Sequence, residues 1–450
     1  MNSSSIRIRY SNKRITRILP TLITAAIKAA DPQEALRGTL IRKGHQIKAG
    51  DITYDLSRFR RVLCVGAGKG SGRMAMALEQ VLGDALEGGI VIVTDGHNTP
   101  CNHIRILEAA HPVPDRRSVK ATQGILSLVQ SLTPHDLLIV LLSGGASSLL
   151  CAPAPGLTLA DQQRTTRLLL RSGATIHDMN IVRKHMSAIK GGQLAQATPA
   201  TILTFIISDV LGDDLATIGS GPTVPDSSTF QDAIDILKQY KIWSKVPMAV
   251  QRQLKKGFAS TVPDILKPPR QRTSRNRHIV LANNSHAIKG LAKAARQLKL
   301  KPFIMPFPFQ GEAKEIGNIL GSLGRDLVEF DNPARPPACL IAGGEPTVTI
   351  KGNGKGGRVQ ECMVAAAQEL AGLHNIFVAG FGTDGTDGPT DAAGAIVDGT
   401  TAERASKKGL DISRVLNNHD SYNFFKHVGG HIITGPTGTN VNDIYFIFAL

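Results

Sequence analysis

The feature that most constrains the fold is a repeated unit in which a short apolar run leads into a glycine-rich segment and then into a helical pattern. The run at residues 61–65 leads into Gly66–Gly72, and the run at residues 137–142 leads into Ser143–Ser148. Runs that stay apolar, without alternating polar residues, are typical of strands covered on both faces. Such strands, alternating with helices along the chain, predict an α/β fold with largely parallel sheets.

The repeated unit is interrupted once, and this interruption predicts two domains. The apolar run at residues 202–207 ends the first series, and a second series begins at residues 278–282, after a basic segment rich in Pro, Ser and Thr. A chain of 450 residues suggests two or three domains of ordinary size. We therefore predict a basic tail at residues 1–17, an N-terminal α/β domain at 18–262, a basic linker at 263–278 and a C-terminal α/β domain at 279–450.

The net charge of +16 raises the question of an anionic macromolecular partner. The basic residues gather in the N-terminal tail and in residues 267–277, outside the glycine-rich segments, so we interpret them as solvated charge. Aromatic residues make up only 4% of the chain, which leaves few side chains on which nucleic-acid bases could stack. We therefore expect small-molecule ligands and no nucleic-acid partner.

Two further observations concern the compartment. No apolar run approaches the roughly 20 residues that a membrane-spanning helix needs, so we expect no membrane association. The five cysteines are scattered without a Cys-x-x-Cys pair, which argues against a zinc site and against a disulfide framework. The sequence therefore predicts a cytoplasmic protein. The oligomeric state is not fixed by the sequence, and a homo-oligomer stays open.

The glycine-rich strand ends are candidate anion sites, because in open parallel sheets ligands bind where strands end and helices begin. The segment that contains Gly66 and Gly68 is not a Walker A loop, nor a G-x-G-x-x-G fingerprint, since Ser71 occupies the third glycine place. It places Lys69 at the start of a helix, where the positive end of the helix dipole disfavours a cation. That local cost predicts that Lys69 faces a bound anion.

A second loop of small residues is also suited to an anion. Ser143, Gly144, Gly145 and Ser147 offer hydroxyl groups and backbone N–H groups that could wrap a phosphate or a carboxylate. A serine nucleophile is the alternative interpretation, but the nucleophile elbow G-x-S-x-G is absent. We therefore predict that this loop binds substrate or phosphate.

A polar stripe follows in the helical pattern that begins near residue 180. On a helix, Asn180, Arg183 and Ser187 share one face, and Lys190 continues it. Such a face is often simply solvated. Beside several anion loops, we interpret it as a clamp on a substrate or phosphate.

Carboxylates stand at the ends of two other predicted strands. Asp209 follows the run at residues 202–207, and Asp384 follows the run at 376–379. Asp387, a little further along the same loop, is predicted to contact the substrate or its phosphate. Such residues can form simple turns, but they can also hold Mg²⁺, which takes one or two carboxylates together with phosphate oxygens and water. We predict that Asp209 and Asp384 divide the roles of general base and metal ligand.

Two more charged groups belong to the C-terminal series. Glu345 follows the glycines that end the predicted strand at residues 339–342, and Arg358 opens a predicted helix after Gly356 and Gly357. A guanidinium beside the free N–H groups of a helix is suited to the charge that develops on a transferring phosphoryl group.

These segments also carry a family resemblance that extends from about Thr21 to Asp443. The motifs that carry it are Val65–Lys69, Glu108–Asp115, Leu142–Ser148, Val182–His185, Lys190–Gly192, Gly212–Asp214, Ser220–Thr223, Gly343–Thr347, Thr383–Gly385, Asp387–Asp391 and Gly438–Asp443. In this order they resemble the glycerate 2-kinase family, whose C-terminal part is called the MOFRL domain and would cover about residues 336–445 here.

The resemblance implies transfer of the ATP γ-phosphoryl group to the 2-hydroxyl of D-glycerate, with Mg²⁺. It also implies a Rossmann-like N-terminal domain, an active site in the cleft between the two domains, and a catalytic pair that falls on Lys69 and Arg358. One departure is Val359, where the family usually has Asn, so a polar contact of the site is in doubt.

Three alternatives stay open. Family members have also been called hydroxypyruvate reductases, and Asp95 follows a predicted strand where an NAD(P)H ribose could bind, although its spacing and the glycine pattern are imperfect. The acceptor could instead be a related small hydroxy acid. The third alternative, a nucleic-acid-binding protein, depends only on net charge.

Overall fold

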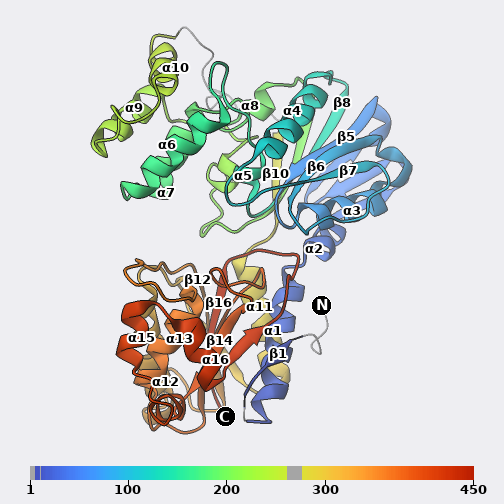
Figure 1. Cartoon of the computed structure of the whole chain (residues 1–450). Helices are drawn as coiled ribbons and strands as arrows, with labels where there is room; N and C mark the ends of the chain where they lie inside the picture. Colours follow the sequence, from blue (N-terminus) through green and yellow to red (C-terminus); the bar gives the residue numbers. More distant parts are fainter. Residues whose placement is uncertain (1–5, 11, 261–275) are drawn as a thin grey trace. The chain divides into compact units, whose positions relative to one another are not determined.

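The computed structural model describes residues 6–10, 12–260 and 276–450, which divide into two compact domains (Figure 1). The N-terminal domain is Pro32–Leu281, and the C-terminal domain combines the segment up to Asp31 with Ala282–Leu450. This division corrects the predicted boundaries, because residues 18–31 belong to the C-terminal domain. The predicted linker lies mostly in 261–275, outside the described residues.

The N-terminal domain is built on a six-stranded sheet. Its order is β7-β6-β5-β8-β9-β10, and the pairs from β7 to β9 are parallel. In chain order this is 3-2-1-4-5-6, the order of the doubly wound dinucleotide-binding fold. The sheet is therefore Rossmann-like, as predicted. The strands are β5 (Arg61–Ala67), β6 (Gly88–Thr94), β7 (Ile104–Ala109), β8 (Asp136–Leu142), β9 (Thr201–Ile207) and β10 (Asn276–Ala282).

Two groups of helices complete this domain. One group, with α4 and α5, packs on the sheet around Val65, Ile92 and Val140, and α3 also packs against the strands. The other group has a core of its own around Val182, Leu237 and Val250, and it lies beside the sheet (Figure 1). The sheet-packed helices are α3 (Ser71–Leu82), α4 (Arg116–Gln130) and α5 (Ala146–Leu149); the separate group is α6 (Leu159–Arg171), α7 (Ile176–His185), α9 (Phe230–Gln239) and α10 (Met248–Phe258).

Smaller elements fill the rest of the domain. α2 packs against α3, and three short strands form an antiparallel sheet in the order β2-β3-β4. The bounds are α2 (Pro32–Thr39), β2 (Leu40–Lys43), β3 (Gln46–Ala49), β4 (Ile52–Asp55) and α8 (Gln193–Gln196).

The C-terminal domain contains a seven-stranded sheet that corrects the prediction of a parallel one. Its order is β1-β15-β14-β13-β16-β12-β11, and only β11 and β12 are parallel. The last strand of the chain, β16, lies between β12 and β13 and runs against both. The strands are β1 (Arg7–Ile8), β11 (Lys301–Ile304), β12 (Ala338–Gly344), β13 (Ile376–Gly382), β14 (Gly394–Asp398), β15 (His431–Ile433) and β16 (Asp443–Ala449).

Helices cover this sheet. α12 and α13 pack together on the strands around Leu340, Val378 and Ile447. α11 packs against β11, β12 and β16, and α1 lies along α11 (Figure 1). The helices are α1 (Ile15–Ala29), α11 (Asn284–Gln297), α12 (Ala313–Glu329), α13 (Arg358–Glu369), α14 (Thr401–Ser406), α15 (Ile412–Asn418) and α16 (Ser421–Val428).

The first residues of the chain are tied into this domain. A Cβ added at Gly290 of α11 would lie 2.4 Å from the Cβ of Ala29, so α1 and α11 approach too closely for a larger residue. β1 pairs with β15, and the Tyr10 hydroxyl donates a hydrogen bond to Asp398. The described part of the predicted basic tail at residues 1–17 therefore packs as part of this domain. Across the described ranges, no helix has the length and apolar character to cross a membrane.

Candidate functional site

The point at which the strand order of the N-terminal sheet reverses lies between β5 and β8. In open α/β sheets a ligand crevice forms at this point, outside the carboxyl ends of the strands. The loop after β5 carries Lys69, and the loop after β8 is Ser143–Gly145. The two loops are joined, since the Lys69 N–H donates to the Gly144 carbonyl at 2.9 Å. Two predicted anion loops therefore meet where a ligand is expected.

The glycine and serine of these loops have a role in this joint. Gly68 has a φ of +136°, and a Cβ added to it would lie 2.1 Å from Ser143 Oγ. The buried Ser143 hydroxyl lies 3.0 Å from the Ser71 hydroxyl and accepts a hydrogen bond from the Gly70 N–H at 3.0 Å. Gly68 and Ser143 thus hold one loop against the other, a role that differs from the ligand contacts we predicted for them.

Three more predicted glycines fit the same picture. A Cβ at Gly66 would lie 2.4 Å from the Leu141 carbonyl oxygen in β8, so Gly66 belongs to the strand contact. Gly145 has a φ of +88°, and a Cβ added to it would lie 3.0 Å from the His111 ring. Gly144 provides the carbonyl that fixes Lys69. Lys69 itself is half-buried and precedes α3, whose N-cap is Gly70.

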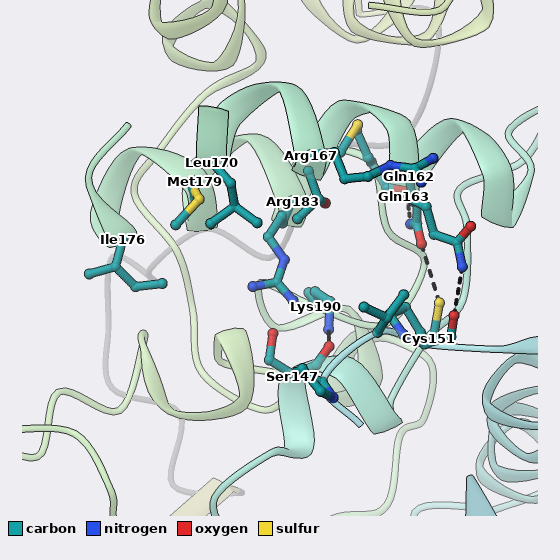
Figure 2. A pocket seen from close by; sticks show the side chains of 15 residues that line it. Ser147, Cys151, Gln162, Gln163, Arg167, Leu170, Ile176, Met179, Arg183 and Lys190 are labelled. Carbon is teal, nitrogen blue, oxygen red and sulfur yellow. Dashed lines mark hydrogen bonds between the residues drawn. The ribbon is translucent and has the colours of Figure 1, made fainter. Parts of the chain in front are cut away.

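A cavity of about 350 Å³ opens beside the β8 loop (Figure 2). It is lined by α6, α7, the turn at 112–114 and the residues that follow β8. Arg183 and Lys190 line it together with Ser147, so the structure brings these three predicted residues to one place. Figure 2 shows the Arg183 guanidinium directed toward the cavity, between the helices and Ser147.

Three cationic side chains line the cavity, Arg167, Arg183 and Lys190, and no acidic residue is among its described lining residues. Among the described residues, no ion pair joins Arg183 or Lys190 to a carboxylate, and no hydrogen bond engages the Arg183 guanidinium. The Lys190 ammonium donates to the carbonyls of Ser147 and Leu150, the latter at 3.0 Å. Burial, and then the charge of Arg183, lowers the pKa of Lys190 to about 7, and burial lowers the pKa of Arg183. A cavity with these groups is suited to an anion.

Asn180 reaches this cavity indirectly. It is buried and accepts a hydrogen bond from the Ser220 hydroxyl at 3.3 Å, and Ser220 is in turn 2.7 Å from the Ser147 hydroxyl. The predicted helical stripe is wrong in its second half, because α7 ends at His185. Lys190 lies in the turn that follows the helix, and it lines the same cavity as Arg183. Asp209, the remaining predicted residue of this domain, is half-buried just after β9.

In the C-terminal domain, three carboxylates lie at the ends of three neighbouring strands, on one side of the sheet. Asp443 opens β16 and is the register partner of both Gly344 and Gly382. Glu345 directly follows β12, and Asp384 follows β13 by two residues. The carboxylates therefore belong to three adjacent strands.

Arg358 lies between two of these carboxylates. Its Nε and Nη2 donate to Asp443 at 2.7 and 3.1 Å, and its Nη1 donates to Glu345 at 3.0 Å. Burial raises the pKa of Asp443 to about 7, although Arg358 acts in the opposite direction. The guanidinium has five N–H groups, so this network leaves it further donors at the first residue of α13.

Asp387 caps the same helix. Its buried carboxylate accepts hydrogen bonds from the N–H groups of Val359 and Gln360 at 3.1 and 2.8 Å, and from the Gln360 amide at 3.0 Å. This role differs from the substrate contact that we predicted for Asp387. The Val359 side chain is fully buried in the apolar core, and its N–H makes the capping bond, so the missing Asn does not interrupt the network described here.

A metal ion could find oxygen ligands at this edge. A Cβ added at Gly382 would lie 3.5 Å from an oxygen of Asp384 and 3.5 Å from an oxygen of Asp443. Within the part of the chain that the structure describes, no three His, Cys, Asp or Glu side chains are arranged to hold a metal. Mg²⁺ suits such a place, because it takes few protein carboxylates and completes its shell with phosphate and water. Asp209 and Asp384 belong to different domains.

Sequence reasoning missed Asp443 as a site residue. The signal was present, because Asp443 ends the family motif Gly438–Asp443. The apolar run at 444–449 was not recognised as a strand, so nothing placed this carboxylate beside Arg358.

Comparison with known proteins identifies the family. Residues 18–255 match the family described as a domain of unknown function (DUF4147), and residues 338–443 match the MOFRL family. The chain is 42% identical over 424 residues to a Pyrococcus horikoshii protein named glycerate 2-kinase, with 94% of each chain covered. The crystal structure of a Thermotoga maritima glycerate kinase matches with a TM-score of 0.84 at 37% identity, over 98% of this chain and 100% of that one.

Another relative bears on the reductase alternative. An Agrobacterium vitis protein, 39% identical over 97% of this chain and 95% of its own, carries hydroxypyruvate reductase as a provisional name. The fold and these relatives define a two-domain α/β phosphotransferase with cationic side chains near its strand ends. Within this class, the chain belongs to the glycerate kinase family.

Proposed function

We propose that this protein is an ATP- and Mg²⁺-dependent glycerate 2-kinase of the cytoplasm. In the reaction, the bond between the γ-phosphorus of ATP and its bridging oxygen breaks, and the 2-hydroxyl oxygen of D-glycerate forms the new bond to phosphorus. The hydroxyl proton leaves to a carboxylate or to solvent. The observation that carries the proposal is the pair of joined loops at the β5–β8 reversal point, where Lys69 stands at the start of a helix.

The proposed roles fall on cations at helix starts and on carboxylates at strand ends. Lys69 and Arg358 supply positive charge to the transferring phosphoryl group, which needs electrostatic stabilisation more than covalent help. Asp209 and Asp384 divide the roles of base and metal ligand, and Glu345 is the next candidate. Mg²⁺ would be held by one or two of these carboxylates and would neutralise charge on the phosphates.

Support for kinase over reductase comes from two sides. Relatives named as glycerate kinases match nearly the whole chain, and one has a crystal structure, whereas the reductase name is carried only provisionally. Asp95, the residue considered for an NAD(P)H ribose, is engaged by Arg117 through two hydrogen bonds of 2.7 and 2.8 Å. The free thiols of the five cysteines support a reducing compartment.

A coupled assay tests the function directly. Purified protein should consume ATP only when D-glycerate and Mg²⁺ are both present, and the product should be 2-phosphoglycerate. Hydroxypyruvate with NADH or NADPH is the parallel reaction, and it should give no turnover. Oxidation of NAD(P)H without ATP would replace the proposal by the reductase, and turnover only with a different hydroxy acid would change the acceptor.

A further inference from the structure

The cavity beside the β8 loop is large for a three-carbon acid. Glycerate has only three carbons and four oxygens, and it fills roughly the space of a few water molecules, at about 30 Å³ each. The cavity measures about 350 Å³, which falls in the range of about 300 to 1,000 Å³ that is usual for larger organic ligands. A glycerate molecule would leave most of this space to water.

The cavity is also divided chemically along its length. The cations Arg183 and Lys190 lie at the side of the β8 loop, together with the Ser147 hydroxyl. Leu170 on α6 and Ile176 on α7 form an apolar patch with Met179, at another end of the cavity from Gln162 and Gln163 (Figure 2). A suitable ligand therefore has an anionic end and a broad apolar body.

The apolar patch is unusually exposed. The side chains of Leu170 and Ile176, on α6 and α7, are 60% and 58% exposed, and Val113 in the facing turn is 61% exposed. Large apolar side chains that gather around one concave site, with polar groups at its end, are typical of ligand-binding sites. A flat aromatic ring would cover these side chains.

We propose that this cavity binds the nucleotide substrate, with the adenine ring against Leu170, Ile176 and Met179 and the phosphates toward Arg183 and Lys190. The assignment rests on the proposed kinase function. It directs the phosphate chain toward the β8 loop, whose Gly144 carbonyl holds the backbone of Lys69. The three-carbon acid then binds outside this cavity.

Two glutamines of α6 also line the cavity. Gln163 donates its amide to the Pro114 carbonyl at 2.7 Å, which fixes the side chain and leaves its own carbonyl oxygen to accept a hydrogen bond. Gln162 is fixed in a similar way by the Met186 carbonyl at 2.6 Å and by the Cys151 thiol at 3.3 Å. Two oriented amides on α6 therefore line the same cavity as Leu170.

The test separates the nucleotide from the acid. ADP is titrated calorimetrically, without glycerate, into the intact protein and into the variants Ile176→Ser and Arg183→Gln. Because Ile176 is exposed, its replacement should leave folding intact. Each variant should raise the Kd for ADP by about tenfold or more, a loss of about 1.4 kcal/mol. In the coupled assay, KM for ATP should rise while KM for D-glycerate stays unchanged. Arg171→Gln, an exposed arginine of α6 outside the cavity, is the matched control.

The other outcomes overturn the assignment. If KM for D-glycerate rises and ADP binding does not change, the cavity belongs to the acid. If neither changes, or if the unmodified protein does not bind ADP, the cavity holds neither substrate in the way proposed. Failure of the kinase function would show separately, as ADP binding in the calorimeter without any ATP-dependent phosphorylation of glycerate.

Discussion

Lys69 is the residue on which the proposed chemistry depends most directly. Its backbone is held by the β8 loop, so replacing the side chain by alanine should leave the joint between the loops intact. We expect Lys69→Ala to lower kcat by about 100-fold or more, as expected for an electrostatic group of the transition state. The far-ultraviolet circular dichroism spectrum should not change. Lys120→Ala, an exposed lysine of α4, serves as control, and a fully active Lys69→Arg enzyme would argue against a specific position for the ammonium.

Asp209 and Asp384 can be told apart by their dependence on magnesium. Replacement by Asn keeps the volume and removes the charge. The variant of the metal ligand should need far more Mg²⁺ to reach half of its maximal rate, since a carboxylate is a stronger ligand than an amide. The variant of the base should instead lose rate at saturating Mg²⁺. Normal rates and normal metal dependence in both variants would move the assignment to Glu345.

We predict that Lys190 makes nucleotide binding sensitive to pH. Its pKa in the ligand-free cavity is about 7, so above pH 7 most of its amino groups are uncharged. An anion must then bind together with a proton. The Kd for ADP should therefore rise with pH, by up to about tenfold per unit between about pH 7.5 and 9, where the phosphate groups are fully ionised.

Other groups around Lys190 do not explain such a dependence. Arg183 stays charged in this range, and burial raises the pKa of the Cys151 thiol, which keeps it neutral. The remaining contacts are the carbonyls of Ser147 and Leu150. In Lys190→Gln the ADP titration should be weaker and independent of pH. A slope that persists in this variant would assign the titration to another group.

Among the elements, α13 depends on a carboxylate from another strand loop. Asp387 satisfies N–H groups in the first turn of the helix, beside the positive end of its dipole. We expect Asp387→Asn to lower the free energy of unfolding by about 1 to 2 kcal/mol, which is the usual cost of losing such a cap. Urea unfolding measures this change. Asp391→Asn, an exposed residue of the same loop, should have a much smaller effect.

The elements also show what the sequence can predict. In the N-terminal domain, β5 and β8 were predicted from their apolar runs and glycine ends, and both are parallel strands as expected. In the C-terminal domain, β12 and β13 were found but their neighbours were not. A fully buried strand is apolar throughout, whether it runs parallel or antiparallel to its neighbours. The apolar runs therefore do not indicate that β16 lies between β12 and β13. The long sequence separation of β16 from β12 gives no local signal.

The candidate site could also be predicted only in part. Lys69 could be singled out because a cation at a helix start is locally unfavourable. Arg358 was predicted from its place beside the free N–H groups of a helix, and Arg183 and Lys190 from a polar stripe. The cavity itself could not be predicted, because its wall is formed by α6 and α7, whose apolar residues look like ordinary core positions. The roles of Ser143 and Asp387 depend on contacts between distant loops, which a motif does not reveal.

For the whole molecule, the domain boundaries predict that the two domains differ in their ability to fold alone. Pro32–Leu281 is one continuous segment with its own sheet and two cores, so this fragment should fold alone and unfold cooperatively on heating. It should also bind ADP, because the whole cavity lies within it. Ala282–Leu450 lacks α1 and should not give a stable domain by itself. Joining residues 6–31 to this fragment through a flexible linker should restore cooperative unfolding; a stable fragment without them would contradict the structural role of α1.

The position of α1 has a consequence for synthesis on the ribosome. The apolar face of this helix, with Leu19, Leu22 and Ile23, emerges long before its partner α11 is made. At about 5 to 20 residues per second, this face waits for roughly ten seconds to a minute while the entire N-terminal domain is translated. During that time it resembles the exposed hydrophobic segments that chaperones recognise. Growth temperature and chaperone supply should therefore affect the yield of this protein more than its final stability would suggest.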